Sequence, residues 1–231
     1  MTSTIFSTPT SEWMRLSGLT DKMQPKMRLA FLRATRSGKI DTEELTRSIA
    51  QIVGQSADTS ASQSGLIFDT SDPTYMLLVE NLVSQYKSLL DDKESKQAAR
   101  NEAGENKLVN TTGLDRFSAT RLQRAANSGM SKTELEKLRK KMLQQRGNLI
   151  ANTETNRAIN SALDALWYVN AAGREVTKSI TTRRDGRVCP YCLPLEGIQE
   201  AVGASFDTKY GVFQYPPFHP QCRCFLFFEV K

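Results

Sequence analysis

Cysteine and histidine are absent from the first 188 residues of this 231-residue chain. All four cysteines and the one histidine lie between Cys189 and Cys224, in the segments Val-Cys-Pro-Tyr-Cys and His-Pro-Gln-Cys-Arg-Cys. Structural cysteines scattered along a chain would not segregate in this way, whereas a metal site or a local set of disulfides would. This Cys/His cluster therefore carries most of the functional information in the sequence.

Other absences narrow the class of protein. No apolar run of roughly 18 residues exists, so we expect no transmembrane helix and no membrane association. The N-terminal residues lack the basic stretch and apolar core of a secretory signal, which favours a reducing cytoplasm, where clustered cysteines more often bind metal than form disulfides. Glycine-rich phosphate loops and a His-x-Glu motif are also missing. We therefore predict that the protein is not an enzyme and has no small-molecule substrate.

Positive charge is concentrated in one segment. The net charge of the chain is +6, and residues 131–187 alone account for all of it. Such a segment could contact nucleic acid or an acidic protein surface, and a solvated helix face is the other interpretation. The candidate contact residues are Lys137, Arg139, Lys140, Lys141, Arg183, Arg184 and Arg187.

Apolar residues at helical spacing predict a long, mainly helical N-terminal part. Helices are expected within residues 11–53, 73–91 and 114–172, with a break at Pro25 and a small, polar linker over residues 54–73. Residues 92–112 have little to bury and predict either an exposed helix or a flexible connection. Asp41 and the Ser131-Lys-Thr-Glu134 capping box mark two helix starts.

Composition changes after Gly173, where Gly, Pro, Thr and aromatic residues become frequent. Alternating segments at 175–181 and 224–230 predict strands. The expected fold class is α+β, in which a small C-terminal α+β module is stapled by the Cys/His cluster. We place a helical region with linkers at residues 1–112 and a second region at 113–231, made of helices (113–173) and the stapled lobe (174–231).

Zinc is the ligand that the cluster fits best. Zinc takes four nitrogen or sulfur ligands tetrahedrally, and a two-residue spacer lets both thiolates of one turn reach the same ion. Five candidates compete for four places. We favour Cys189, Cys192, His219 and Cys222, with Cys224 as the alternative ligand.

Two other interpretations of the cluster stay open. Cys-Pro-Tyr-Cys also occurs in thiol redox proteins, but 39 residues after Cys192 are too few to complete that fold. A pair of structural disulfides would require an oxidising environment, such as an extracellular particle.

The ordered motifs resemble the phage head morphogenesis family, the Mu F-like minor head proteins, over residues 115–228. The resemblance rests on Thr153-Glu154, Ala158, Asn160, Asp185-Gly-Arg-Val-Cys-Pro-Tyr-Cys192, Leu195-Glu-Gly197, Phe206, Pro216-Pro217 and His219-Pro-Gln-Cys-Arg-Cys224. Many members have a tryptophan where this chain has Ser179-Ile180, a difference that affects packing and no candidate ligand.

The resemblance implies a structural minor head protein of a tailed phage. Such a protein would associate with the portal protein and with capsid or scaffold proteins in head assembly, and would contact packaged double-stranded DNA during packaging or ejection. It would lie in the virion, in the head interior or at the portal vertex, after assembly in the host cytoplasm. The alternative is a zinc-stapled DNA-binding module.

Overall fold

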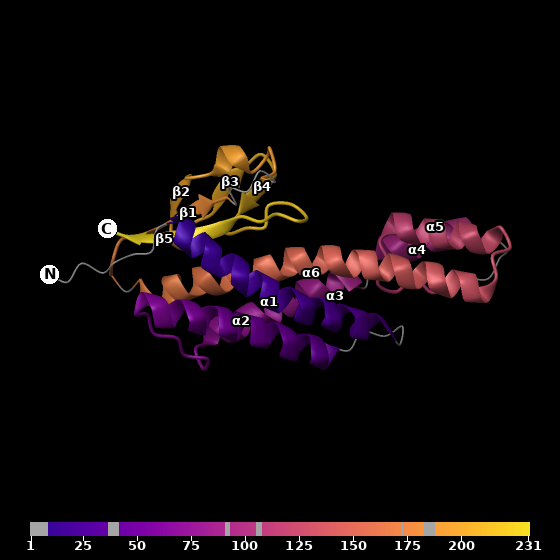
Figure 1. Cartoon of the computed structure of the whole chain (residues 1–231), viewed down its shortest axis with the longest axis horizontal. Coiled ribbons are helices and arrows are strands. Elements are labelled where there is room, and N and C mark those ends of the chain that lie inside the picture. Colours follow the sequence, from indigo (N-terminus) through magenta and orange to yellow (C-terminus); the bar gives the residue numbers. More distant parts are fainter. Residues whose placement is uncertain (1–8, 37–41, 91–92, 105–107, 172, 183–187) are drawn as a thin grey trace.

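The computed structural model describes residues 9–36, 42–90, 93–104, 108–171, 173–182 and 188–231. The molecule is elongated, with helices along its whole length and a small lobe of strands beside one end (Figure 1). Its helices are α1 (Pro9–Arg36), α2 (Thr42–Ser64), α3 (Pro73–Leu90), α4 (Lys93–Ala103), α5 (Arg116–Asn127) and α6 (Lys132–Asn170). No helix in this described part is both long enough and apolar enough to cross a membrane.

Helix α6 is the longest element, with 39 residues. The predicted capping box starts it: the Ser131 hydroxyl accepts from the Glu134 amide, and the Glu134 carboxylate accepts from the Ser131 amide. Helices α1, α2 and α3 pack against α6 towards the lobe, while α4 and α5 form an arm at its beginning (Figure 1). Helix α6 therefore joins the two ends of the molecule.

The core between α1, α2 and α6 is formed by the apolar faces that the sequence predicts. Phe31 of α1 is fully buried and lies directly against Gly147 of α6. A Cβ atom at position 147 would lie 2.9 Å from the Phe31 ring. Glycine therefore allows the two helices to approach closely here.

Two expected interruptions are wrong. Pro25 lies inside α1, where Met23 and Met27 on either side are buried and hold the helix together across it. Residues 54–64 continue α2 and do not form a linker. The hydroxyls of Ser56 and Ser60 donate to carbonyls one turn earlier, so their hydrogen-bonding groups are paired within the helix. Their small side chains then let α2 pack closely.

The sequence predicts either an exposed helix or a flexible connection for residues 92–112. Residues 93–103 form the exposed-helix alternative, α4, whose small residues Ala99 and Ala103 are buried. Asp41, the predicted cap, lies outside the described residues.

The C-terminal lobe confirms the predicted strand module. Strands β1 (Val176–Thr181), β2 (Gln199–Ala201) and β5 (Phe225–Val230) form an antiparallel sheet in the order β2-β1-β5. Strands β3 (Phe206–Thr208) and β4 (Gly211–Phe213) form a separate hairpin. The sheet packs on α6, where the rings of Trp167 and Phe228 stack 5.3 Å apart.

A buried ion pair also fastens the lobe to α6. Lys178, in the middle of β1, is fully buried, and its Nζ lies 2.8 Å from Oδ1 of Asp164. The same ammonium donates to the Gln214 carbonyl at 2.7 Å, and the Gln214 side chain donates to the other Asp164 oxygen. Each charge is thus paired and hydrogen-bonded, which buried charges require.

Candidate metal centre

The first half of the site is the turn Cys189-Pro-Tyr-Cys192 between β1 and β2. The amides of Cys192 and Leu193 both donate to the Cys189 carbonyl, at 2.9 and 3.1 Å, and a short 3₁₀ helix (η1, Leu193–Leu195) follows. This tight turn brings the two cysteine side chains to one side. Cys192 is buried and Cys189 is half-buried.

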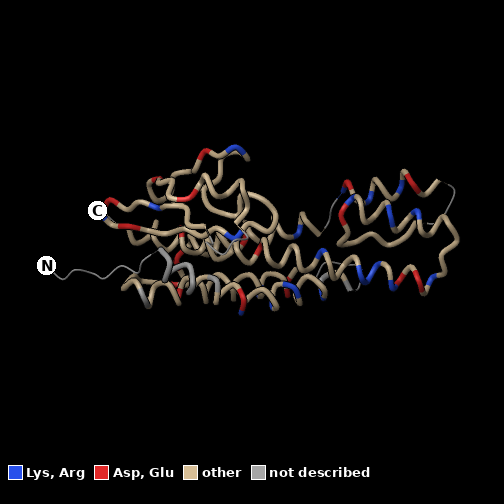
Figure 2. Tube along the Cα trace, turned by 45° about the horizontal axis from the view of Figure 1, so that its top comes forward, with Lys and Arg blue, Asp and Glu red and all other residues tan. Residues whose placement is uncertain are grey.

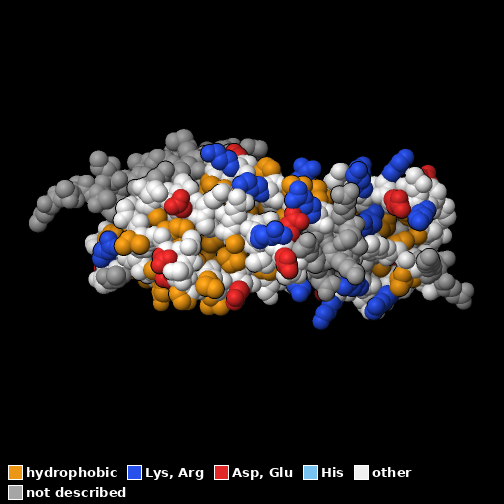
Figure 3. All heavy atoms as spheres, turned by 90° about the horizontal axis from the view of Figure 1, so that it is seen from below, with side chains coloured by type: hydrophobic (Ala, Val, Ile, Leu, Met, Phe, Trp, Pro, Cys, Tyr) orange, Lys and Arg blue, Asp and Glu red, His pale blue; other side chains and the backbone are white. Residues whose placement is uncertain are grey.

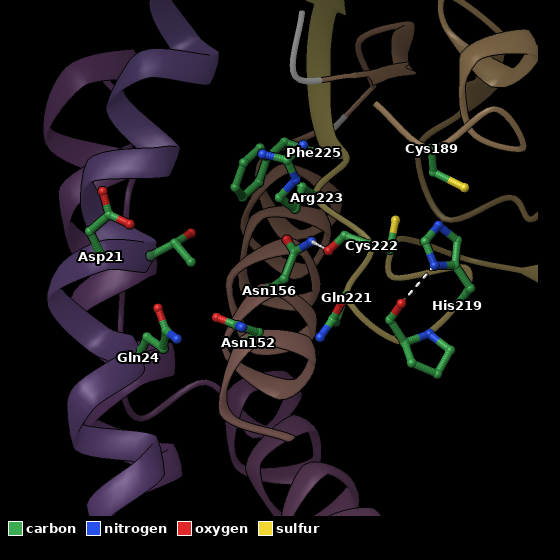
Figure 4. Close-up of a pocket in the computed structure, with 12 residues that line it drawn as sticks. Asp21, Gln24, Asn152, Asn156, Cys189, His219, Gln221, Cys222, Arg223 and Phe225 are labelled. Atoms are coloured by element: carbon green, nitrogen blue, oxygen red, sulfur yellow. Dashed lines mark hydrogen bonds between the residues drawn. The ribbon is translucent and has the colours of Figure 1, made fainter. Parts of the chain in front are cut away.

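The second half is the loop from His219 to Cys224, which leads into β5. The Cys222 amide donates to the His219 carbonyl at 3.1 Å, and Gln221 between them adopts a left-handed conformation with φ of 62°. This is rare for a residue with a side chain and occurs where the surroundings impose it. The turn places His219 and Cys222 near Cys189 (Figure 4), and both contact the Cys192 sulfur.

All five predicted ligand residues gather in two overlapping groups that share Cys192. One group is Cys189, Cys192 and His219, and the other is Cys192, Cys222 and Cys224, with ligand atoms within 4.8 Å of one another in each group. The Cys192 and Cys222 sulfurs are 3.9 Å apart. Two thiolates on one tetrahedral zinc would be about 3.8 Å apart, given zinc–sulfur bonds of about 2.3 Å. Which four of the five residues would bind remains a prediction.

His219 is oriented for such a role. Its Nδ1 lies 2.7 Å from the Pro220 carbonyl, and its Nε2 lies 3.0 Å from the Cys192 sulfur. An Nδ1–H that donates to a backbone carbonyl leaves the Nε2 lone pair directed at the thiols, an arrangement common among metal-binding histidines.

The thiols are strongly coupled. All four cysteines are free, and hydrogen bonds from Cys192 and Cys224 lower the pKa of Cys222 well below its usual value. The contact with Cys222 raises the pKa of Cys192 to about 12, and the contacts with Cys192 and Cys222 raise the pKa of Cys224 further. One thiolate thus makes it hard to form another, and a bound cation would relieve this repulsion.

Three side chains of α6 hold the loop that carries the ligands. The Thr153 hydroxyl accepts from the Gln221 amide at 3.0 Å. The Asn156 amide group donates to the carbonyls of Cys222 (2.7 Å) and Cys224 (3.2 Å). Thr153, Asn156 and Asn160 follow one another at helical spacing, and we call them the α6 clamp.

Asn160 completes the clamp at the start of β5. Its side chain donates to the Cys224 carbonyl at 3.2 Å and accepts from the Leu226 amide at 2.9 Å. It also donates to the Asn156 side-chain oxygen at 2.6 Å, which fixes how both amides are turned. Sequence reasoning named Thr153 and Asn160 only through the family resemblance and missed Asn156. The available signal is the helical spacing of Thr153, Asn156 and Asn160, which places three polar residues on one face of the predicted helix.

A polar cavity of about 510 Å³ opens between α1, α6 and the ligand loop (Figure 4). Asp21 and Gln24 of α1 face Asn152 and Asn156 of α6 across it. Cys189, His219 and Cys222 line its far side, whereas Cys224 does not line the cavity.

The predicted basic contact residues do not surround the cluster. Lys137, Lys140 and Lys141 are exposed on the first half of α6, on the arm at the opposite end of the helix (Figure 1). Arg139 is a structural residue there, because its guanidinium donates to the carbonyls of Asn110 and Thr112. These four residues therefore lie away from the Cys/His cluster, and a contact of Lys137, Lys140 and Lys141 with a partner stays a prediction.

The other three predicted contact residues, Arg183, Arg184 and Arg187, lie outside the described residues, as does Asp185.

Comparison with known proteins identifies one family. The family model described as "Phage Mu protein F like protein" matches residues 117–227, from the start of α5 to β5. The match includes α6, the α6 clamp and all five residues of the Cys/His cluster. No curated protein and no solved structure matches the chain.

Proposed function

Because residues 117–227 match the model of the phage Mu protein F like family, we propose that the chain is a structural minor head protein of a tailed phage. It would act in the virion and dock on the portal protein and on the capsid or scaffold proteins during assembly. The family match carries this proposal. The elongated helical shape supports it, because long helices offer extended surfaces to partner proteins (Figure 1).

The role proposed for the chain is structural and not catalytic. The candidate centre offers mostly thiol ligands, which are typical of closed structural zinc sites. Zinc would be held by Cys189, Cys192, His219 and Cys222, with Cys224 as a substitute. It would join the two ligand turns and, through the α6 clamp, fasten the lobe to α6.

Exposed apolar side chains near the lobe support a docking role. Leu77 on α3 and Tyr168 on α6 are 59% and 60% exposed and line the same cavity between α3, α6 and the lobe. Met76 on α3 is 59% exposed. Some exposed apolar residues are normal, but a contiguous apolar surface commonly marks a protein interface.

Quantitative mass spectrometry of purified particles tests the head-protein assignment. We expect a few copies in each intact particle, and loss of the protein after DNA ejection would indicate a role in delivery. Complete absence from mature particles would contradict the assignment and leave an assembly factor that departs before maturation.

The zinc site has its own test. We expect about one zinc per chain, lost in Cys189→Ser, with the lobe unfolding first when the metal is removed by a chelator. Cys224→Ser is the matched control, because it should retain zinc if the favoured four ligands bind. A metal-free protein whose unfolding is unchanged by chelator would refute the zinc staple.

A further inference from the structure

The candidate zinc centre would carry an excess of negative charge, because three thiolates and a neutral histidine outweigh the two positive charges of the ion. Much of the protein's positive charge lies elsewhere: residues 93–146 have thirteen Lys and Arg against six Asp and Glu. Figure 2 shows these cations at the arm end of the molecule, and Figure 3 shows Lys and Arg side chains at the same end. Charges farther apart than about 10 Å are largely screened, so groups beside the cluster have to stabilise the thiolates.

Cys189 is the candidate ligand with the least support from its surroundings. Cys222 and Cys224 are buried, and the α6 clamp holds their carbonyls. Cys189 is half-buried, and the hydrogen bonds of its turn end on its backbone carbonyl. These bonds fix the backbone of the turn, but they do not by themselves fix the direction of the Cys189 sulfur.

Tyr210 lies in the two-residue turn of the β3–β4 hairpin, where Thr208 pairs with Gly211. The Thr208 hydroxyl accepts from the Tyr210 amide at 3.2 Å and donates to the Gly211 carbonyl at 2.9 Å. Gly211 has a φ of 120°, a conformation that residues with a side chain rarely adopt. These features fix the turn and therefore the point from which the Tyr210 side chain starts.

The Tyr210 ring lies between the two ligand turns. Its centroid is 5.7 Å from that of Tyr191 in the first turn and 5.8 Å from that of His219 in the second. The Lys209 ammonium lies 4.0 Å from the Tyr191 ring centroid and 5.6 Å from that of Tyr210. Two aromatic rings and a cation therefore cover this side of the cluster.

The hydroxyl oxygen of Tyr210 is buried, and no nitrogen or oxygen atom of the described residues pairs with it. A buried hydroxyl without an acceptor is unfavourable. Burial and the nearby sulfurs of Cys189 and Cys192 raise the pKa of Tyr210 to about 12. The phenol therefore keeps its proton at neutral pH and is available as a hydrogen-bond donor.

We propose that the Tyr210 hydroxyl donates a hydrogen bond to the Cys189 sulfur and positions this thiolate as a metal ligand. Cys189 is the better acceptor of the two sulfurs, because His219 Nε2 and the Cys222 sulfur already contact Cys192, at 3.0 and 3.9 Å. The hydrogen bond stabilises negative charge on the thiolate and fixes the direction of the sulfur. This inference rests on the zinc centre proposed above and adds a positioning residue that the Cys/His pattern does not include.

The test compares two tyrosine-to-phenylalanine variants of the full chain. Tyr210→Phe removes the buried hydroxyl and keeps the ring contacts. Tyr191→Phe is the matched control, because it removes the hydroxyl of an exposed tyrosine from the same group of rings. Zinc affinity is measured by chelator competition, and cobalt(II) replaces zinc so that the thiolate-to-metal charge-transfer band reports on the sulfurs.

We expect Tyr210→Phe to weaken zinc binding about tenfold. The cobalt band should move to longer wavelength, because a thiolate that loses a hydrogen bond gives up its electrons more easily. For the same reason Cys189, located by peptide mapping, should be alkylated faster by iodoacetamide in the metal-loaded variant. Tyr191→Phe should change none of the three readouts.

Unchanged zinc affinity and an unchanged cobalt band in Tyr210→Phe would overturn the inference while leaving the zinc centre in place. Weaker zinc binding with the same cobalt band and the same alkylation rate would also overturn it, because the hydroxyl would then support only the fold. Absence of metal from the unsubstituted chain would refute the zinc centre and this inference with it. Far-ultraviolet circular dichroism verifies that both variants stay folded.

Discussion

Asn156 should be the most sensitive residue of the α6 clamp. Its side chain satisfies the Cys222 carbonyl at 2.7 Å, shares the Cys224 carbonyl with Asn160, and accepts from Asn160 at 2.6 Å. In Asn156→Ala the Cys224 carbonyl keeps one donor, whereas the described structure offers no other side-chain donor to the Cys222 carbonyl. A buried acceptor left without a partner costs about 1–3 kcal/mol.

Asn152→Ala provides the matched control. Asn152 lies one turn earlier on α6, faces the same cavity and makes no hydrogen bond through its side chain to any described residue. The two substitutions gain the same helix propensity, and Asn152 is only half-buried, so their difference reports the buried contacts of Asn156. We expect Asn156→Ala to lower the free energy of unfolding by about 1–3 kcal/mol relative to Asn152→Ala.

The assay is urea unfolding of both variants with saturating zinc, together with chelator competition for the metal. Because Asn156 holds the carbonyls of two candidate ligand residues, zinc affinity should fall by about tenfold or more in Asn156→Ala. If the two variants unfold within about 0.5 kcal/mol of each other, the clamp does not stabilise the ligand loop and the reasoning is wrong.

Two further predictions concern the core. Lys178→Met should cost about 3–5 kcal/mol at neutral pH, because it leaves the Asp164 carboxylate buried and unpaired, and Lys178→Met with Asp164→Leu should recover most of this loss. Burial already raises the pKa of Asp164 above 3.8, and removing the Lys178 ammonium raises it further. The folded variant then binds more protons than the unfolded chain, so its stability should fall as pH rises from about 4. A flat stability profile in pH-dependent urea unfolding would contradict this. Gly147→Ala should lower the thermal midpoint, because the new Cβ meets the Phe31 ring at 2.9 Å and overpacking costs about 1–3 kcal/mol, more than the helix propensity gained. Gly54→Ala is the control, because a Cβ atom at position 54 would have no atom within 4 Å, and this variant should have a higher thermal midpoint by calorimetry. A higher midpoint in both glycine variants would show that α1 and α6 move apart without cost.

The elements that the sequence predicts best have strong local signals. The capping box at Ser131 is predicted correctly because hydrogen bonds within three residues decide it. The two long strands form where the sequence predicts them, although most of their side chains are buried and their burial does not alternate. The sequence mispredicts Pro25 and residues 54–64 because the deciding contacts are with other helices. Burial of residues on both sides of Pro25, and close packing of the small residues of α2, outweigh local preferences.

The same distinction between local patterns and long-range contacts applies to the Cys/His site. Cysteine and histidine spacing is a local property, and the structure brings all five residues together. The clamp contacts of Asn156 join residues 66 and 68 positions apart, and no local pattern reports them. Lys178 is the clearest case, because a lysine in a strand is normally exposed and only the distant Asp164 and Gln214 explain its burial.

The family match and the fold together indicate what the unmatched N-terminal half contributes. The matched segment starts at Phe117, and on its own it would leave the middle of α6 bare, because Gly147, Ile150 and Ala151 are buried under α1 and α2. One continuous core includes residues of α1, α2, α3 and α6. The N-terminal helices therefore cover the helix that connects the arm to the Cys/His cluster. About 24 Å of α6 separates residue 140 from Asn156, and the N-terminal helices cover the stretch between the arm and the α6 clamp.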